Sequence, residues 1–499
     1  MDYIHSPNFP SHVEKLMKKY HVPGVAVAVI EGERTFSAGY GLASLDPPKP
    51  CTADTLFDIA SSSKSLTAAS VGLLVRDNDK YPDVQYESIM SNLLPDDFVM
   101  SGQGYTEGVT VDDILSHRTG LPRHDESFIG LRSAQPDDAR SVTRNLRNLA
   151  VTEPLRSKYQ YNNIMYTVAT YLVEKKSGLA FADFLQEHFF GPLEMHSTHL
   201  QPERARTFGL GDRIALGYSW DKESERYTGF EPLDSPEAQG AGSIITSVND
   251  YIKWVKAMMN QEHPVDEEVY KGLTKMRTFA TQDADNRDPF TSPVVYAAGL
   301  EIFYYRGHIV IGHDGSFSGF GSRHFFVPEF KLGGAIFGNA GNAGDIATIL
   351  SRELIDEVLG VPLSERPDWD KVMTDENLKY ENDPKEEEMR RVLREDAQPQ
   401  KMPLSAYTGE YWNPGYRGMT VEVKDNKLLI NATDRSPGFS LTFDHIREQT
   451  EYIAHLSEFQ EGGDYLIRAK FMFENDRAIK LGLELGYDEF IWFGRVEGA

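Results

Sequence analysis

Residues 57–64 read FDIASSSK and run into the apolar residues 65–74. This pattern predicts a strand-like segment that turns into a helix, with Ser61 and Lys64 three residues apart at the helix start. The spacing places both side chains on one helical face, close to the positive end of the helix dipole. Because a partly desolvated lysine can accept a proton, Lys64 can activate the Ser61 hydroxyl as a nucleophile. The alternative is a polar helix start with a solvated lysine, and motifs further along the chain decide between the two.

Two such motifs follow in order. Tyr161 and Asn163 form a Y-x-N pattern that opens another predicted helix. A phenol beside an ammonium group can have its pKa lowered enough to act as a base, and an amide can orient a substrate. Further on, the β-branched strand at residues 309–312 is followed by His313 and Gly315 in an H-x-G pattern, where glycine lets a substrate approach the backbone.

This order of motifs resembles that of the serine β-lactamase and penicillin-binding protein superfamily, and most closely its branch of class C β-lactamases, D-aminopeptidases and esterases. A loop and a helix entry of the same branch match residues 111–122 and 240–254, and its first strand matches residues 22–29. Together the motifs cover roughly residues 10–360. Because so many motifs occur in the order typical of the family, the interpretation of Ser61 as a nucleophile is favoured over that of a polar helix start with a solvated lysine.

The resemblance implies acyl transfer through a covalent acyl-enzyme. In that mechanism Ser61 attacks a carbonyl carbon, while Lys64 and Tyr161 carry the protons. The backbone N–H groups of Ser61 and Ser316 are expected to hold the oxyanion. The residues expected to bind substrate are Asn163, His313, Gly315 and Ser316.

His313 is the main departure from the family pattern. β-Lactamases and penicillin-binding proteins usually carry Lys-Thr-Gly on this strand, where the cation binds a substrate carboxylate. A mostly neutral imidazole binds that carboxylate poorly. The H-x-G pattern is frequent in the esterase and aminopeptidase branches, so we expect little β-lactamase activity. The alternative for His313 is a structural hydrogen bond at the end of the strand.

The composition excludes several classes of partner. A length of 499 residues exceeds one typical domain, and a hydrophobic fraction of 40% is enough for a sizeable core. The formal net charge is −25, so nucleic acids and anionic membrane surfaces would repel the chain. No apolar run approaches the length needed to cross a bilayer. We therefore expect neither a nucleic-acid nor a membrane partner.

Cys51 is the single cysteine, so the chain can form no disulfide within itself, as is usual in a reducing compartment. The first residues, MDYIHSP, lack the basic and apolar regions of a secretory signal. We therefore expect a cytoplasmic protein, the alternative being that a leader has been removed. In the cytoplasm, the cell-wall peptides on which many members of the family act become unexpected substrates.

Hydrophobic periodicity predicts the order of the elements. We expect a helix and two strands over residues 11–50, mostly helices over residues 56–260, strands over residues 296–340 and a helix at residues 345–359. The resemblance implies an α+β, β-lactamase-like fold, in which an antiparallel sheet is flanked by helices and carries a large helical subdomain. Residues 1–360 are the predicted catalytic domain.

The composition changes after residue 360. Residues 361–402 contain four prolines, acidic runs and few apolar residues, which predicts a linker with one charged helix near residues 384–396. Residues 403–499 alternate short strands and turns, as in a small antiparallel barrel or sandwich. The pattern YTGEY at residues 407–411 resembles the opening of a lipocalin-like domain found in some relatives, so we expect a C-terminal lipocalin-like β-barrel.

Other histidines and glycines are weaker candidates for a site. His188, His196 and His199 have no common zinc-ligand spacing, and the glycine-rich residues 339–344 lack the lysine of a phosphate-binding loop. His117 is expected to be a hydrogen-bonded loop residue. We expect neither a metal nor another cofactor.

The sequence therefore predicts a serine hydrolase that cleaves an ester or amide bond of a small molecule or short peptide. Two alternatives are an acyltransferase of secondary metabolism that passes the acyl group to an alcohol, and an inactive relative that serves as an assembly or ligand-sensing module. The motifs do not separate hydrolase from transferase, because both reactions pass through the same acyl-enzyme. The oligomeric state is left open, a homo-oligomer included.

Overall fold

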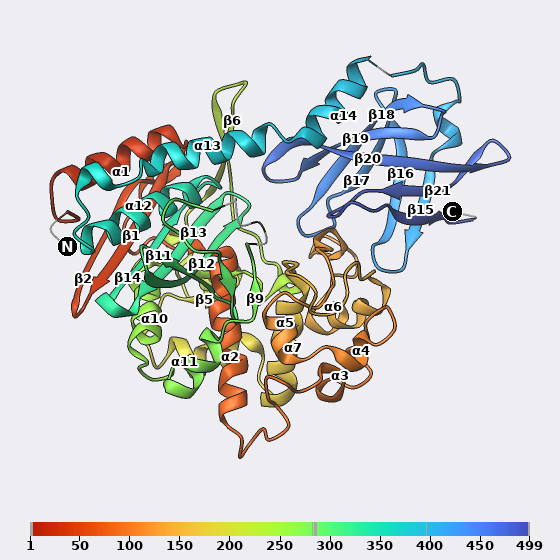
Figure 1. Ribbon diagram of the computed structural model, residues 1–499. Coiled ribbons are helices and arrows are strands. Elements are labelled where there is room, and N and C mark those ends of the chain that lie inside the picture. Colours follow the sequence, from red (N-terminus) through yellow and green to blue (C-terminus); the bar gives the residue numbers. More distant parts are fainter. Residues whose placement is uncertain (1–2, 282, 284–286, 396, 498–499) are drawn as a thin grey trace.

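The computed structural model describes residues 3–281, 283, 287–395 and 397–497. Figure 1 shows a larger body of helices and sheet, which contains the N-terminus, and a β-barrel that carries the C-terminus. Helices α13 (Trp369–Glu381) and α14 (Pro384–Glu395) connect the two. The predicted antiparallel sheet with flanking helices and the predicted C-terminal barrel are confirmed.

The larger body is built on a nine-stranded antiparallel sheet with the order β3-β2-β1-β14-β13-β12-β11-β10-β9. Since β1 lies beside β14, the sheet joins the two ends of this body, and the segments between β3 and β9 form an insertion. The strands are β1 (Gly24–Glu31), β2 (Arg34–Leu45), β3 (Pro48–Pro50), β9 (Thr278–Phe279), β10 (Val295–Tyr296), β11 (Glu301–Tyr305), β12 (His308–Phe317), β13 (Phe320–Val327) and β14 (Leu332–Gly338).

Helices cover β1 on both faces of the sheet. Within residues 25–30, the odd-numbered side chains belong to a core beneath α1 (Asn8–Lys19) and α12 (Ala343–Val358). The even-numbered side chains belong to the core on the opposite face, which includes α2 (Lys64–Arg76) and α10 (Val248–Asn260). Because side chains alternate along a strand, a strand covered on both faces is apolar at every position.

Helix α2 runs through the centre of the insertion. Its residues 64–74 are all buried, and α7 (Ile164–Ser177) and α11 (Glu267–Thr274) pack along it. The other helices are α3 (Met90–Leu93), α4 (Tyr105–Gly108), α5 (Val111–Leu115), α6 (Ala139–Asn145), α8 (Phe181–Leu185) and α9 (Pro202–Thr207). The short strands are β4 (Phe57–Asp58), β5 (His199–Leu200), β6 (Gly217–Asp221), β7 (Arg226–Phe230) and β8 (Ile244–Thr246).

The segment 361–402 differs from the predicted linker with one helix. The described part of this segment contains two α-helices, and α13 packs Trp369 and Met373 into the core beneath α1 and α12. Helix α14 instead packs Met389 against the barrel. Because so few side chains of each helix are buried, the sequence shows no broad apolar stripe from which the first helix could be predicted.

Eight antiparallel strands form a closed barrel, in which β22 pairs back onto β15. Closure leaves no unpaired edge strand, and aromatic side chains such as Tyr411, Phe471 and Phe493 are buried in it. The strands are β15 (Gly409–Asn413), β16 (Arg417–Lys424), β17 (Lys427–Ala432), β18 (Phe439–Arg447), β19 (Glu451–Glu458), β20 (Gly462–Glu474), β21 (Arg477–Leu483) and β22 (Ile491–Arg495).

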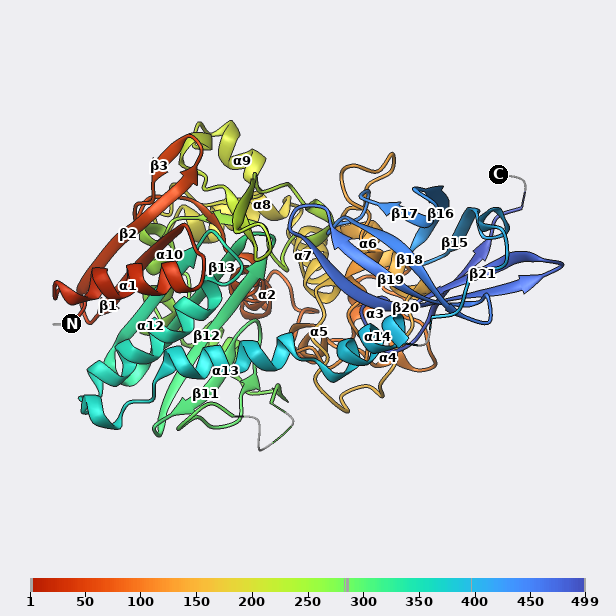
Figure 2. The ribbon, with the colours of Figure 1, turned by 90° about the horizontal axis from the view of Figure 1, so that it is seen from above.

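Several hydrogen bonds dock the barrel on the larger body, and two sets of them lie near Ser61 and strand β12. Residues 128–130 run beside residues 434–436, and two main-chain hydrogen bonds of 2.8 and 3.2 Å join them. In the second set, the Gly319 N–H donates to the Glu461 carboxylate (2.5 Å) at the turn between β12 and β13. Figure 2 shows the barrel strands over α6, as does the view of Figure 1. The barrel is thereby fixed beside the turn that follows β12.

Candidate active site

Ser61 lies in a single 3₁₀ turn, Ala60–Ser63, between strand β4 and helix α2. Ala60 has a left-handed backbone (φ 45°), which is unfavourable for a residue with a Cβ atom. The Ala60 N–H donates to the Asp58 carboxylate (2.8 Å), which helps to hold this conformation. The strained turn places the Ser61 hydroxyl at the start of α2, with Lys64 one turn further on.

Lys64 is fully buried and has three hydrogen-bond partners. Its Nζ lies 2.9 Å from the Ser61 Oγ, 2.9 Å from the Asn163 Oδ1 and 2.7 Å from the Ala241 carbonyl oxygen. Burial lowers the pKa of Lys64 well below its ordinary value. A neutral amine has two hydrogens and one lone pair, so if Asn163 and Ala241 accept the hydrogens, the lone pair faces the Ser61 hydroxyl.

The Tyr161 hydroxyl donates a hydrogen bond to the Ser61 Oγ (2.8 Å). Burial raises the pKa of Tyr161 above its ordinary value, so the phenol keeps its proton. Burial lowers the pKa of Lys64, so the amine gives up its proton readily. The geometry therefore favours Lys64 as the base and Tyr161 as a proton donor.

The Asn163 side chain is held at both ends. Its Oδ1 accepts from Lys64, and its Nδ2 donates to the Asp125 Oδ2 (3.0 Å). The same carboxylate oxygen accepts from the Arg123 Nε (3.1 Å). Sequence reasoning missed Arg123 and Asp125, because they follow the loop at residues 111–122 without any spacing motif of their own.

His117 is buried beside Tyr161. Its Nδ1 accepts from the Asn162 N–H (3.0 Å), and its ring centroid lies 4.3 Å from that of Tyr161. Burial lowers the pKa of His117 well below its ordinary value. His117 is thus a neutral, hydrogen-bonded loop residue, as predicted, and it packs against Tyr161.

His313 is buried and uses both ring nitrogens within the protein. Its Nδ1 lies 2.5 Å from the Asp314 carbonyl oxygen, and its Nε2 lies 2.8 Å from the Tyr296 hydroxyl. Burial, together with repulsion from Lys64, lowers the pKa of His313 to about 3. The imidazole is therefore neutral, donates from Nδ1 to Asp314 and accepts from Tyr296. This placement favours the structural alternative for His313 over direct contact with substrate.

Gly315 brings β12 against the turn that holds Ser61. A Cβ atom on Gly315 would lie 2.2 Å from the Ile59 carbonyl oxygen and 3.0 Å from the Ser61 nitrogen, so only glycine fits. Strand β12 is longer than predicted and includes Ser316, because it pairs with β13 as far as Phe317. The backbones of Ser61 and Ser316 thus belong to two segments in contact.

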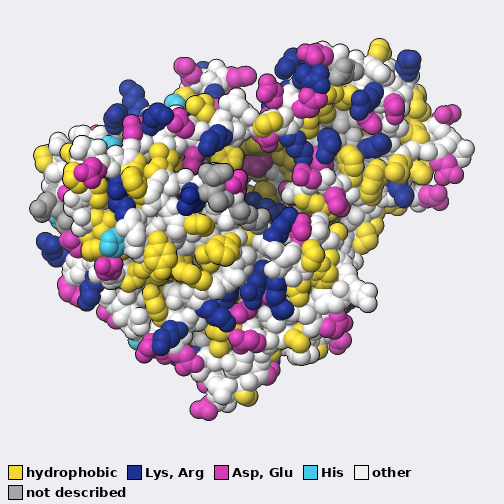
Figure 3. Space-filling model, in the orientation of Figure 1, with side chains coloured by type: hydrophobic (Ala, Val, Ile, Leu, Met, Phe, Trp, Pro, Cys, Tyr) yellow, Lys and Arg dark blue, Asp and Glu magenta, His cyan; other side chains and the backbone are white. Residues whose placement is uncertain are grey.

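A cavity of about 400 Å³ opens at Ser61. Asn163 and Ser316 line it as well, together with Arg123 and Asp125. The barrel contributes Ser436, Pro437, Glu458 and Gly486 to its wall. Figure 3 shows that this face of the molecule is hollowed where the two bodies meet. The cavity is therefore a site that the larger body does not complete alone.

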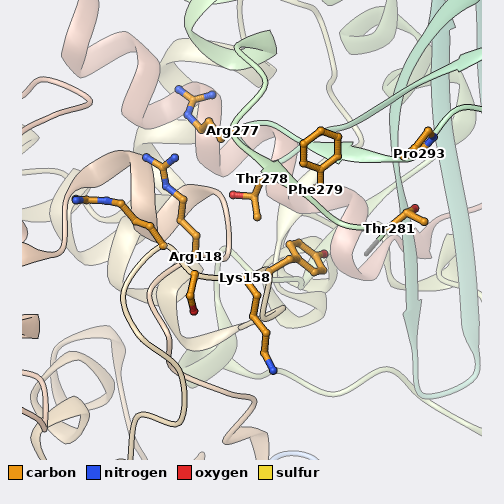
Figure 4. A pocket seen from close by; sticks show the side chains of 10 residues that line it. Arg118, Lys158, Arg277, Thr278, Phe279, Thr281 and Pro293 are labelled. Carbon is orange, nitrogen blue, oxygen red and sulfur yellow. The ribbon is translucent and has the colours of Figure 1, made fainter. Parts of the chain in front are cut away.

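A second pocket, of about 570 Å³, shares no lining residue with the first. Its cationic side chains include Arg118, Lys158 and Arg277 (Figure 4). Arg118 and a fourth cation of this pocket, Arg156, share the Asp113 carboxylate, while Arg277 pairs with Asp112 and Lys158 with Glu153. All four cations are therefore engaged in ion pairs within the protein.

In the part of the chain that the structure describes, no three or more His, Cys, Asp or Glu side chains are grouped so as to hold a metal ion. The described helices also include none with both the length and the apolar character needed to cross a membrane.

Comparison with known families gives two matches. The family described as Beta-lactamase matches residues 9–355. A domain of unknown function, DUF3471, matches residues 393–495, which contain the barrel.

Two fungal relatives are similar over most of their length. "Unguisins hydrolase ungD'" of Aspergillus campestris is 35% identical and covers 87% of this chain and 82% of its own. "Unguisins hydrolase ungD" of Aspergillus violaceofuscus is 33% identical and covers 98% of this chain and 90% of its own. Among solved structures, the octameric penicillin-binding protein homologue from Pyrococcus abyssi has a TM-score of 0.60 at 18% identity. The match covers 97% of this chain and 98% of that one. These matches confirm the predicted β-lactamase-like fold.

Proposed function

The chain belongs to the beta-lactamase family, and from this premise we propose that it is a serine hydrolase that cleaves an ester or amide bond of a small molecule or short peptide through an acyl-enzyme on Ser61. The observation that carries this proposal is the contact of the Ser61 Oγ with both the Lys64 Nζ (2.9 Å) and the Tyr161 hydroxyl (2.8 Å) at the wall of a cavity. A nucleophile beside a base and a proton donor is the arrangement that acyl transfer requires.

In the proposed cycle Ser61 attacks the substrate carbonyl carbon, and its hydroxyl proton passes to the Lys64 Nζ. The oxyanion is held by the backbone N–H groups of Ser61 and Ser316. Tyr161 then donates its proton to the leaving alcohol or amine and recovers one from the Lys64 ammonium group. In the second half, water gives a proton to Lys64 and attacks the acyl carbon. Ser61 then leaves, taking up that proton from the Lys64 ammonium group, and the free acid is released.

Asn163 holds the Lys64 amine in the position from which it accepts the proton of Ser61. Because Asp125 fixes the amide nitrogen, the amide oxygen faces Lys64 and takes up one hydrogen of the neutral amine. The Ala241 carbonyl takes up the other. This orientation supports Lys64 as the group that accepts the proton from Ser61.

The names of the two fungal relatives support hydrolysis over transfer to an alcohol. They also make unguisins the first compounds to test. The inactive alternative is disfavoured by the complete set of contacts at Ser61.

Mass spectrometry of the intact protein tests the proposal. The chain is incubated with a panel of esters, thioesters, D-amino acid amides, β-lactams and unguisins. We expect a mass increase equal to the acyl group, located on Ser61, which disappears as free acid accumulates. The variant Ser61→Ala should gain no mass, whereas Ser63→Ala, in which a buried neighbouring hydroxyl is lost, should still be acylated. Acylation of another residue, or turnover by Ser61→Ala, would contradict the assignment. When an alcohol is added, the ratio of newly formed ester to free acid distinguishes a transferase from a hydrolase.

A further inference from the structure

Two carboxyl groups face the Ser61 cavity from different bodies. Glu126 belongs to the turn Asp125–Ser127, and Glu458 ends strand β19 of the barrel. Both line the same cavity as Ser61. Resting on the proposed hydrolase function, we propose that Glu126 and Glu458 form a subsite for a positively charged group of the substrate, an ammonium or a guanidinium.

The position of Glu126 is fixed by the contact between the two bodies. Its Oε2 is shielded from solvent and has no hydrogen-bond partner in the described parts of the chain. A Cβ atom on Gly486 of the barrel would lie 3.0 Å from this oxygen, so the barrel backbone closes against it. The pairing of residues 128–130 with 434–436 anchors the same turn. A buried carboxyl oxygen without a partner is unfavourable unless something binds it.

The position of Glu458 is fixed by the hairpin between β19 and β20. In this hairpin Glu461 accepts from the Gly319 N–H (2.5 Å), and the Gln460 amide donates to the Glu231 carbonyl oxygen (3.1 Å). Both contacts cross from the barrel to the larger body. Glu458 is therefore held at the cavity, next to the turn that follows the strand of Ser316.

The nearby charges compensate the two carboxyl groups only in part. Arg123, the cation that lines the same cavity, pairs with Asp125. Among the residues that the structure describes, none forms an ion pair with Glu126 or Glu458. Burial raises the pKa of Glu126 to about 7; repulsion from Asp125 and Glu458 adds to this effect, and attraction to Arg123 opposes it. Burial and repulsion from Glu461 likewise raise the pKa of Glu458 to about 7.

A bound cation would stabilise the two buried carboxylates. It would offset the repulsion between the carboxylates and give the unpartnered oxygen a charge-assisted hydrogen bond. Since the subsite shares its cavity with Ser61, the cation belongs to a molecule whose carbonyl group reaches the nucleophile. The barrel thus takes part in substrate choice, because one of the two carboxylates is its own.

Direct binding tests the subsite independently of turnover. The full-length variant Ser61→Ala is titrated calorimetrically with three ligands that differ in charge: alanine amide (an α-ammonium group), N-acetylalanine amide (neutral) and Nα-acetyl-lysine amide (a side-chain ammonium group). We expect at least one cationic ligand to bind about tenfold or more tightly than the neutral one. Glu458→Gln and, separately, Glu126→Gln should bring the cationic and neutral ligands to within about twofold.

A matched control removes a barrel charge elsewhere. Glu422→Gln changes an exposed carboxylate on β16 and should leave the preference for the cation intact. Comparing the two cationic ligands tells whether the α-amine or a basic side chain is recognised. Equal binding of charged and neutral ligands, no measurable binding of any, or an unchanged preference in Glu458→Gln and Glu126→Gln would each overturn the subsite.

Kinetics then separate this inference from the proposed function. The p-nitroanilides of the same three acyl groups are assayed with the chain that retains Ser61, and kcat/KM for cationic over neutral substrate should fall about tenfold in Glu458→Gln. If cations bind as expected but Ser61 is never acylated, the hydrolase proposal fails and the subsite stands. If neutral and cationic anilides are cleaved alike in every variant, the hydrolase stands and the subsite fails.

Discussion

Replacing Lys64 by arginine should abolish acylation of Ser61. In the structure a neutral Lys64 donates its two hydrogens to Asn163 and Ala241, so that its lone pair faces Ser61. A guanidinium group keeps its proton at any pH used for assay and offers no lone pair. Loss of the general base from a serine nucleophile lowers kcat by about 10⁴-fold, or about 5.4 kcal/mol of transition-state stabilisation.

The pH profile gives the same test a second readout. The neutral amine is the active form, so the acylation rate of the native chain should rise as the pH passes the lowered pKa of Lys64 and fall away below it. Stopped flow measures the burst of p-nitrophenol that an ester releases on acylation, at pH values between 5 and 10. We expect the rate constant of the burst to rise about 10²-fold over this range. Lys64→Arg should lack both the burst and the limb.

A fold control is needed, because Lys64 is fully buried and arginine is larger. Thermal unfolding of Lys64→Arg is compared with that of Lys64→Met, which has a similar length and no charge. Both variants should unfold cooperatively and be inactive. A folded Lys64→Arg variant with a near-native burst would refute the role of Lys64 as the base, whatever the profile of the native chain.

Four further outcomes are expected. Ser62→Ala removes a buried 2.9 Å hydrogen bond to a serine of β13 and should lower the free energy of unfolding by about 1 kcal/mol in urea titrations, with kcat unchanged. Asp125→Ala releases the amide of Asn163 and should lower kcat about 10–100-fold in ester assays with little change in thermal stability. Gly315→Ala introduces a Cβ atom 2.2 Å from a carbonyl oxygen and should destabilise the fold by about 1–3 kcal/mol and slow acylation; native stability and rate would show that the strand is not pressed against the nucleophile turn. Penicillins should acylate the chain slowly in mass spectrometry, because His313 is neutral and offers no cation to their carboxylate; rapid hydrolysis would contradict this.

Local spacing predicted the core of the candidate site. Ser61 and Lys64 are one helical turn apart, so their contact follows from backbone geometry alone. The order of the three motifs then placed Tyr161 and Asn163 at the same point, and the structure brings both there. The central strands of the sheet followed from short continuous apolar runs and those of the barrel from alternating ones, because both patterns act between residues close along the chain.

The sequence by itself determined which groups are candidates for the chemistry and on which elements they lie, because helix and strand periodicities act between residues close along the chain. Only the tertiary structure decided the state of those groups. Burial among distant segments lowers the pKa of Lys64 and raises that of Tyr161, which favours the amine over the phenol as the base. It also turns His313 towards Tyr296 and brings Glu458 of the barrel to the cavity at Ser61. Such effects depend on which remote segments exclude water from a site, and no local pattern in the sequence records that choice.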